Sequence, residues 1–339
     1  MRVIRGLSAV AHPPLRAVVT VGVFDGVHRA HQRLIRSTVG MARRLKGTSV
    51  VVTFDPDPQT VLDPGHAQPA LMPLEARLAR LCALGVDWVW VIPFTKRFAR
   101  MRAEQFIREV LIRRLHACGL VVGETFAFGR GRRGGLKILQ ALGSAHGMQV
   151  VPVREIRVGG LPISSSRIRQ LIASGQLANA RRLLGDAPVL YGVVVPGAGR
   201  GRRLGFPTAN LRMLSEVLPP RGVYAVLVRR LDGSGAWRGA TPPPSGVREM
   251  RTAGRGPLAF GEPLGGGVMN LGVRPTFGPG PLVCEVHLLN FSGALRGHRV
   301  ALLLLARLRN ERCFPSPRSL IRQIRQDLRR TRRIFARRS

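Results

Sequence analysis

The chain has 339 residues, of which 45% are hydrophobic and 5% aromatic, and its formal net charge is +36 at pH 7. That length is sufficient for two domains of about 150 residues, each with its own core. No run of about 18 uncharged apolar residues occurs, which argues against a membrane-spanning helix. The N-terminus also lacks the apolar core of a signal peptide. The sequence therefore predicts a cytoplasmic protein with two domains and no membrane partner.

The positive charge does not by itself define a nucleic-acid site. Only three of the 54 basic residues are lysines (Lys46, Lys96 and Lys137), and the arginines are spread along the whole chain. A dedicated RNA surface concentrates basic residues and places aromatic side chains among them for base stacking. We therefore expect no specific nucleic-acid partner, and only weak, salt-dependent binding.

The four cysteines share no spacing that is typical of a metal site or of a disulfide framework. No C-x-x-C pair occurs among Cys82, Cys118, Cys284 and Cys313. We expect reduced thiols, as in a cytoplasmic protein.

The first half of the chain alternates short β-branched runs with longer amphipathic segments, which predicts βαβ units around a parallel sheet. Ligands bind at the carboxyl ends of the strands in an open sheet of this kind. The loops that follow the strands are therefore the candidate sites. Strands are predicted at 17–23, 49–54, 86–93, 120–122 and 149–153, and helices at 28–45, 74–84, 103–116, 136–146, 167–172 and 177–184.

The pattern changes after Asp186-Ala-Pro188, where predicted strands follow one another with no helix between them. This arrangement predicts a small antiparallel β-barrel. A stretch at 237–267, rich in Pro, Gly and Ser, predicts a flexible insertion. The domains are thus expected at 1–186 and 187–339. The predicted strands are 189–196, 222–229, 268–271, 282–289 and 299–305, and a closing helix at 316–336 has an apolar face of Leu320, Ile321, Ile324 and Leu328.

The first candidate site follows the first predicted strand, where a Phe24-Asp25-Gly26 turn leads into a helix that carries His28 and His31. Residues three apart lie on one face of a helix. Free N–H groups at a helix start bind phosphate, and imidazoles can donate to oxygens that gain charge during its transfer. An ordinary surface pair and a zinc site are the alternatives, although no third zinc ligand is evident.

Three further segments stand where the same sheet would place a site. Phe54-Asp-Pro56-Asp-Pro58 follows one strand, a segment from Gly123 through Thr125 to Phe128 follows another, and Ser164-Ser165-Ser166 opens a helix that includes Arg169. The serines alone would also fit an ordinary helix N-cap. The G-x-G-x-x-G pattern at 129–134 does not follow directly on a strand, so it does not predict a dinucleotide site.

The second candidate site lies in a glycine-rich segment from Gly197 to Asn210. Its glycines allow a backbone to close around phosphate, and the Thr208 hydroxyl and Asn210 amide suit Mg²⁺ and phosphate oxygens. The G-K-[ST] ending of a Walker A loop is missing, and a basic glycine-rich turn is the alternative. Further along the chain come Arg221-Gly-Val-Tyr224, Asn270-Leu-Gly-Val-Arg-Pro275-Thr276 and Glu285.

The order of these motifs resembles the bacterial bifunctional riboflavin kinase/FAD synthetases over almost the entire chain. The resemblance implies a nucleotidyltransferase-like α/β domain with a Rossmann-like parallel sheet, followed by a riboflavin kinase β-barrel with a C-terminal helix. The implied activities are phosphorylation of riboflavin by ATP to FMN and adenylylation of FMN by a second ATP to FAD, with Mg²⁺ as the cofactor.

The resemblance also implies roles for individual residues. Glu285 would be the kinase base, His28 and His31 would steady the ATP phosphates, and Thr208 and Asn210 would hold Mg²⁺. The remaining implied binding residues are Gly22, Phe24, Asp25, Gly26, Phe54, Pro56, Pro58, Gly123, Thr125, Phe128, Ser164, Ser165, Ser166 and Arg169 in the first domain, and Gly199, Gly205 and Pro207 in the second.

Several positions depart from the family pattern. Ala30 replaces the glycine of H-x-G-H, Thr125 replaces Asn or Asp, and Ser166 replaces Thr. In the kinase half, Asn290, Ala294 and Arg296 stand for Asp, Asp and Tyr. The alternatives are therefore a kinase with an impaired adenylyltransferase half, or a non-catalytic paralogue that binds nucleotide, flavin or RNA. The retained His28, His31, Thr208, Asn210 and Glu285 argue against a fully decayed, non-catalytic paralogue.

Overall fold

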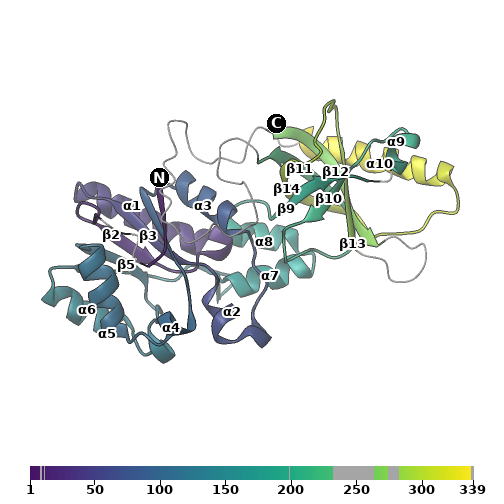
Figure 1. Cartoon of the computed structure of the whole chain (residues 1–339). Helices are drawn as coiled ribbons and strands as arrows, with labels where there is room; N and C mark the ends of the chain where they lie inside the picture. The colour runs from purple at the N-terminus through teal and green to yellow at the C-terminus, as the bar shows by residue number, and fades with distance from the viewer. Residues whose placement is uncertain (8–9, 11, 198, 232–262, 274–281, 337–339) are drawn as a thin grey trace. The chain divides into compact units, whose positions relative to one another are not determined.

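The computed structural model describes residues 1–336 except 8–9, 11, 198, 232–262 and 274–281. The contacts between residues divide it into two compact units (Figure 1). The first contains residues 1–69 and 74–164, and the second contains 70–73 together with the chain from 165 to the C-terminal helix.

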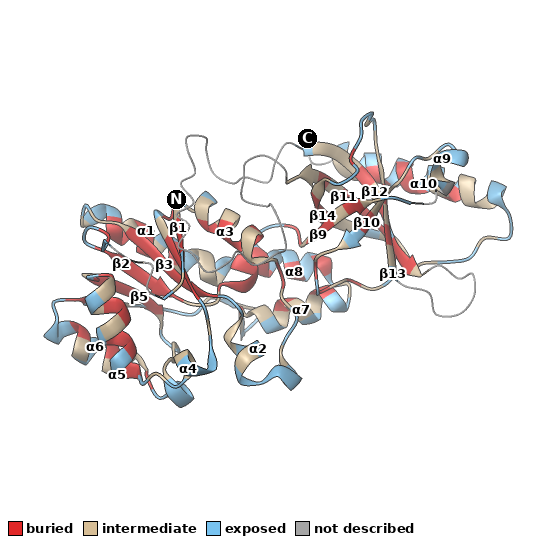
Figure 2. Cartoon of the chain, viewed as in Figure 1, coloured by how far each residue is buried: buried red, intermediate tan, exposed pale blue. Residues whose placement is uncertain are grey.

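The first unit is built on a parallel sheet with the strand order β1-β4-β3-β2-β5-β6, which confirms the predicted architecture. Every residue of β2 and β3 is buried. Figure 2 shows the sheet as the most deeply buried layer of this unit. Continuous apolar strands of this kind are typical of a parallel sheet covered on both faces. The bounds are β1 Arg2–Arg5, β2 Val18–Val21, β3 Ser49–Phe54, β4 Trp88–Ile92, β5 Gly119–Gly123 and β6 Gln149–Val153.

Strand β1 was not predicted, because its four residues begin and end with arginine and show no long apolar run. It pairs with β4 at the edge of the sheet. The indole N–H of Trp90 donates a hydrogen bond to the carbonyl of Gly6 at 2.8 Å, which holds the chain just after β1. A distant side chain therefore supports this edge strand.

The helices of the first unit mostly lie where they were predicted. One difference is the segment predicted as a helix at 103–116, which forms a short α-helix that continues with wider π-type turns and buries Ile107, Val110 and Leu111. The α-helices are α1 Arg29–Arg44, α2 Pro58–Leu62, α3 Leu74–Ala83, α4 Lys96–Ala99, α5 Ala103–Phe106 and α6 Leu136–Ala145, with the π-type stretch η3 at Ile107–Arg114. Short 3₁₀ turns are η1 Asp25–Val27, η2 Pro64–His66 and η4 Arg130–Arg132, and β7 Arg157–Val158 pairs with β8 Leu161–Pro162.

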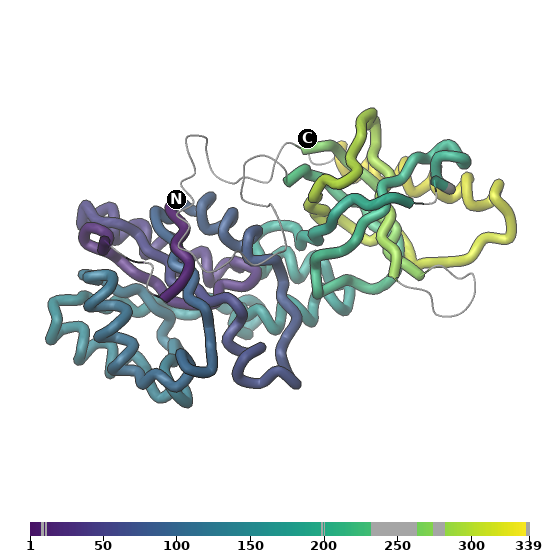
Figure 3. The backbone as a smooth tube through the Cα atoms, in the orientation of Figure 1, coloured from purple at the N-terminus to yellow at the C-terminus, as the bar shows by residue number. Residues whose placement is uncertain are grey.

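The second unit is a closed barrel of antiparallel strands with the order β10-β13-β12-β11-β14-β9, which also confirms the prediction. Its backbone can be followed in Figure 3. Strand β10 was not predicted, because it follows directly on the glycine-rich segment and buries only Leu211. The bounds are β9 Val189–Val195, β10 Ala209–Met213, β11 Gly222–Arg230, β12 Pro263–Val273, β13 Leu282–Leu288 and β14 Arg299–Arg309.

Strand β12 begins earlier than predicted, because residues from Gly265 onward pair with β11 and those from Gly267 onward also pair with β13. The expected insertion at 237–267 therefore does not include 263–267, which are strand. Its residues 237–262 lie outside the described part of the chain.

The second unit also contains α7 Ser165–Ala173, α8 Leu177–Leu184, α9 Arg200–Arg203 and α10 Pro317–Ala336. Leu177, at the start of α8, packs into the barrel core. Helices α7 and α8 therefore belong to the same unit as the barrel. The domain limits 1–186 and 187–339 remain a prediction.

The buried face of α10 differs from the predicted apolar face. Leu328 is buried as expected, but Leu320, Ile321 and Ile324 are only half-buried. Polar side chains take their place, namely Gln323, Asp327 and Thr331, which recur every four residues along the helix. The spacing of apolar residues cannot reveal this buried face, because the residues that form it are hydrophilic.

Two hydrogen bonds account for the burial of Asp327. Arg309 Nε of β14 donates to Asp327 Oδ2 at 2.9 Å, and Gln323 Nε2 donates to Asp327 Oδ1 at 2.8 Å. Asp327 is 1% exposed, so its carboxylate depends on these donors instead of water. The ion pair thereby connects α10 to the barrel.

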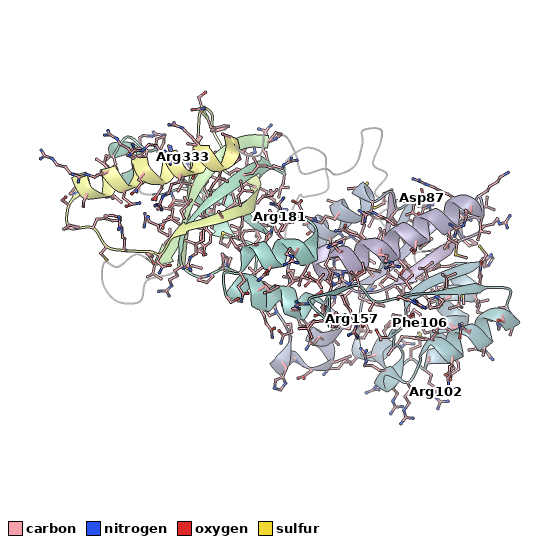
Figure 4. All side chains as sticks on the ribbon, turned by 180° about the vertical axis from the view of Figure 1, so that it is seen from behind. Asp87, Arg102, Phe106, Arg157, Arg181 and Arg333 are labelled. Atoms are coloured by element: carbon pink, nitrogen blue, oxygen red, sulfur yellow. The ribbon has the colours of Figure 1, made fainter. Side chains whose placement is uncertain are left out.

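Replacing Asp327 with Ala should lower the free energy of unfolding by about 3 to 5 kcal/mol, because it leaves the partly buried Arg309 charge without its partner. Urea denaturation followed by circular dichroism measures the change. Arg333→Ala on the same helix is the matched control; Arg333 is exposed (labelled in Figure 4) and should change stability by less than about 0.5 kcal/mol. Equal losses in the two variants would contradict the role of the ion pair.

Candidate active sites

The first site lies at the centre of the parallel sheet. Strand β2 has β3, β4 and β1 on one side and β5 and β6 on the other, so the order of the connections reverses beside it. In open α/β sheets, ligands bind outside the carboxyl ends of the strands at such a point. The segment from Gly22 to His28 leaves β2 at this point, as the sequence predicted.

The backbone between β2 and α1 is unusually tight. Phe24, Gly26 and Val27 have φ angles of 56°, 78° and 40°, all in the left-handed region. Glycine adopts this region freely, but for Phe and Val it costs on the order of 1 to 3 kcal/mol each. Phe24 and Val27 are almost fully buried, and Val27 N–H donates to the Phe24 carbonyl at 3.1 Å. Packing therefore maintains a conformation that the residues would not choose by themselves.

The two histidines meet at the start of α1. His28 is the N-cap residue, and its Nδ1 accepts a hydrogen bond from the His31 N–H at 3.4 Å. Because a backbone N–H can only donate, the proton of neutral His28 lies on Nε2. The rings of His28 and His31 stack with centroids 3.6 Å apart, and Phe24 meets His31 edge-on at 5.2 Å. The structure thus brings together the predicted Phe24, His28 and His31.

Both imidazoles are neutral at pH 7. Burial lowers the pKa of His28 to about 4. Burial also lowers the pKa of His31 well below its usual value, and the nearby His28 and Arg77 add to this shift. Nδ1 of His31 is buried and has no hydrogen-bond partner among the described residues. The arrangement offers neutral N–H donors beside the positive end of a 16-residue helix, which is an environment suited to phosphate.

Ala30 carries no backbone penalty. It lies within the regular helix α1 and is not among the residues with positive φ. An alanine in a regular helix costs nothing relative to other residues. Thr125, another departure from the family pattern, is exposed in a turn after β5, where the Phe126 N–H donates to the Gly123 carbonyl at 3.0 Å.

An aromatic cluster lies beyond the ends of β3, β4 and β5. Phe54 ends β3, and its ring centroid is 5.5 Å from that of Phe94. Phe106 of α5, labelled in Figure 4, contacts both Phe98 and Phe128. Sequence analysis identified Phe54 and Phe128 but missed the phenylalanines of the loop and helices after β4, which no motif marks: Phe94, Phe98 and Phe106.

The serine-rich segment falls where the two units meet in the sequence. Ser164 is the last residue of the first unit, and Ser165, Ser166 and Arg169 lie in the first turns of α7 in the second. All but Ser166 are half-buried. Their contribution to the site at His28 remains a prediction.

The second site lies on the outer wall of the barrel. Asn210 of β10 pairs with Glu285 of β13, which in turn pairs with Asn270 of β12. Their sequence neighbours Leu211, Cys284 and Met269 belong to the barrel core. Because successive side chains of a strand point to opposite faces, the three polar side chains point outward. Directly opposed residues have Cβ atoms about 4.5 to 5.5 Å apart. The sheet register therefore aligns Asn210, Glu285 and Asn270, and Asn270 was not predicted as a site residue.

Two glycines allow the glycine-rich loop to approach this wall. A Cβ on Gly197 would lie 1.9 Å from Asn210 Nδ2, and a Cβ on Gly201 would lie 2.4 Å from the Phe206 carbonyl oxygen. A side chain at either position would collide with the wall or with the loop itself. His287 Nδ1 donates to the Pro207 carbonyl at 2.8 Å and anchors the loop to β13.

The loop and the wall enclose a cavity of about 440 Å³. Thr208 and Asn210 line it, together with the predicted Gly199 and Pro207. The cavity also contains Ala294 and the exposed Arg296, two of the positions that depart from the family pattern. Gly205 lies in the same loop, with φ at 84°.

The fold and the comparisons together define a nucleotide-using transferase, with one candidate site in each unit. Two family models match the chain, FAD synthetase over residues 11–167 and riboflavin kinase over residues 184–335. The chain belongs to the bifunctional riboflavin kinase/FMN adenylyltransferase family. It is 34% identical over 328 residues to the member from Escherichia coli (strain K12), covering 96% of each chain. It is 33% identical to the member from Haemophilus influenzae, covering 99% of each.

A solved crystal structure, named as that of a macrolide-efflux protein from Streptococcus pneumoniae, has a similar fold, with a TM-score of 0.77 and 28% sequence identity. The similarity covers 98% of this chain and 99% of that one. Within the described part of the present chain, no helix has both the length and the apolar character that crossing a membrane requires.

The His28 pKa predicts how stability depends on pH. Because the pKa is about 4 in the folded state and 6.5 ordinarily, the folded state resists protonation. The contribution of neutral His28 to the free energy of unfolding is fully present above pH 6.5. It should fall by about 3 kcal/mol as the pH drops towards 4. Urea denaturation of the wild type and of His28→Gln over this range measures the difference. The variant should lose less stability on acidification, whereas the exposed control His146→Gln should follow the wild type.

Proposed function

We propose that the chain converts riboflavin to FMN in the barrel and FMN to FAD in the α/β unit, using one ATP for each step. The observation that carries this proposal is that each unit assembles a site from its own residues. His28 and His31 stack at the start of α1, and Asn210 and Glu285 pair on the barrel wall. Ala30, which favoured a kinase-only alternative, fits its helix without strain.

In the kinase step, Glu285 accepts the proton of the riboflavin 5′-hydroxyl as its oxygen attacks the γ-phosphorus of ATP, and ADP leaves. Thr208 and Asn210 provide oxygen donors of the kind that Mg²⁺ prefers, and both line one cavity, so these residues fit the metal. When bound there, Mg²⁺ neutralises charge on the transferred phosphoryl group. Gly197 and Gly201 let the loop backbone close over that group.

In the adenylyltransfer step, a phosphate oxygen of FMN attacks the α-phosphorus of ATP, and pyrophosphate leaves. Nε2–H of His28 and the ring of His31 donate to the oxygens that gain charge, while the start of α1 attracts the phosphates. Neutral rings suit this role because each keeps one N–H to donate and does not change its protonation near pH 7. The flavin ring packs against the aromatic cluster near Phe54 and Phe128, with Pro56 and Pro58 in the adjoining loop.

We also propose a cytoplasmic protein that binds nucleic acid only weakly. All four cysteines are free, which supports a reducing compartment. Phe206 and one side of α10 line a cavity of about 760 Å³ that includes Arg318, Arg322, Arg325, Arg329 and Arg332. Such a surface attracts any polyanion through charge alone.

Anisotropy with labelled single-stranded RNA tests this weak binding. It should decrease steeply as the salt concentration rises from about 50 to about 200 mM, with no preference for sequence. Sequence-selective binding that persists at the higher salt concentration would contradict it.

Glu285→Gln separates the two steps. The amide accepts no proton, so riboflavin phosphorylation should fall by a factor of about 10² to 10⁴, while adenylylation of added FMN should stay at the wild-type rate. Chromatography of the flavins measures both rates in one preparation.

His31→Asn is the reciprocal variant and should impair only FAD formation. If either substitution slowed both steps equally, the assignment of one site to each unit would be wrong.

A further inference from the structure

Arg77 is a buried arginine beside the first site that no motif identified. It lies on α3 and is 7% exposed. Its Nη1 donates to the Val23 carbonyl at 2.5 Å and to Thr53 Oγ1 at 3.4 Å. Burying a guanidinium is expensive unless its charge and donors are used. The position of Arg77 therefore requires an explanation.

The Val23 carbonyl is the last one before the tight turn. It accepts a second hydrogen bond from Thr53 Oγ1 of β3 at 3.1 Å. Arg77 on α3 and Thr53 on the neighbouring strand thus hold Val23, two residues beyond the end of β2. The left-handed residues Phe24 and Val27 follow immediately, so any movement of Val23 would be transmitted to His28 and His31.

Charges around Arg77 explain how its positive form is retained. Burial lowers its pKa, and four carboxylates oppose this shift: Asp25 in the turn, Asp55 and Asp57 after β3, and Glu75 on α3. Arg77 Nε is buried and has no hydrogen-bond partner among the residues that the structure describes. The guanidinium is therefore held as a cation in the interior, close to the turn.

We propose that Arg77 is a positioning residue for adenylyl transfer, which fixes the Val23 carbonyl and thereby the turn that presents His28 and His31. This inference rests on the proposed FMN adenylyltransferase function. The charge of Arg77 has a second effect. Burial keeps His31 neutral, and the neighbouring His28 and the Arg77 charge add to this effect. Arg77 therefore helps to fix where both imidazoles lie and helps to keep His31 neutral.

The test compares Arg77→Met and Arg77→Lys in the full chain. Arg77→Met should lower kcat for FAD formation from FMN by about 10²-fold through misplacement of the imidazoles, with a smaller change in KM. The decrease of kcat for FAD formation at low pH should begin at a higher pH in Arg77→Met, because removing the positive charge raises the pKa of His31. Arg77→Lys keeps the charge and one donor, so it should recover part of kcat. Its kcat should decrease at the same low pH as in the wild type.

Two controls make the outcome decisive. FMN formation by the kinase unit, measured on the same preparations, should be unchanged and reports that the barrel unit is folded. Arg44→Met replaces an exposed arginine at the end of α1 and should leave both steps unchanged. Wild-type chain that makes no FAD would refute the proposed function itself. The inference about Arg77 would be overturned if Arg77→Met kept the wild-type kcat and pH profile. It would also be overturned if kcat fell but began to decrease at the same low pH as in the wild type.

Discussion

The turn between β2 and α1 is the constraint on which the first site depends. Within a few residues the chain must leave a buried central strand, reverse direction and begin a helix whose free N–H groups face the ends of the strands. Left-handed Phe24 and Val27 make this possible, and deep packing of their side chains maintains it, together with the hydrogen bond from Arg77 to the Val23 carbonyl. The same compactness buries His28 and the Nδ1 atom of His31, and burial lowers the pKa of both imidazoles. The packing that sets the geometry of the turn therefore also keeps the two rings neutral.

The second unit achieves a comparable result by sheet register. Closure of the barrel fixes the pairing of β10, β13 and β12, and this pairing alone brings Asn210, Glu285 and Asn270 side by side on the outer wall. The proposed phosphate-binding part is a loop that can approach the wall because Gly197 has no side chain, and that can fold on itself because Gly201 has none. One unit therefore builds its site on strained backbone and the other on regular strands, which is consistent with separate steps at separate sites.

Apolar patterning was enough to predict most of the framework. Strand β3 and helix α1 have long, continuous signals, and the motifs after them lie where a parallel sheet places ligands. Elements supported by distant partners escaped prediction, as with β1, which depends on Trp90 and β4, and with the polar face of α10, which depends on Arg309. Arg77 escaped for the same reason, because its role arises from contacts with β3 and the turn that no local pattern records.

The most direct test of the account is chromatography of the flavins formed by purified protein with ATP and Mg²⁺, in parallel reactions that start from riboflavin and from FMN. If each unit carries its own working site, FAD forms in both reactions, and FMN appears before FAD in the reaction from riboflavin. FMN that accumulates without FAD would show that the adenylyltransferase site does not work, despite its stacked histidines. No product from either substrate would contradict both site assignments.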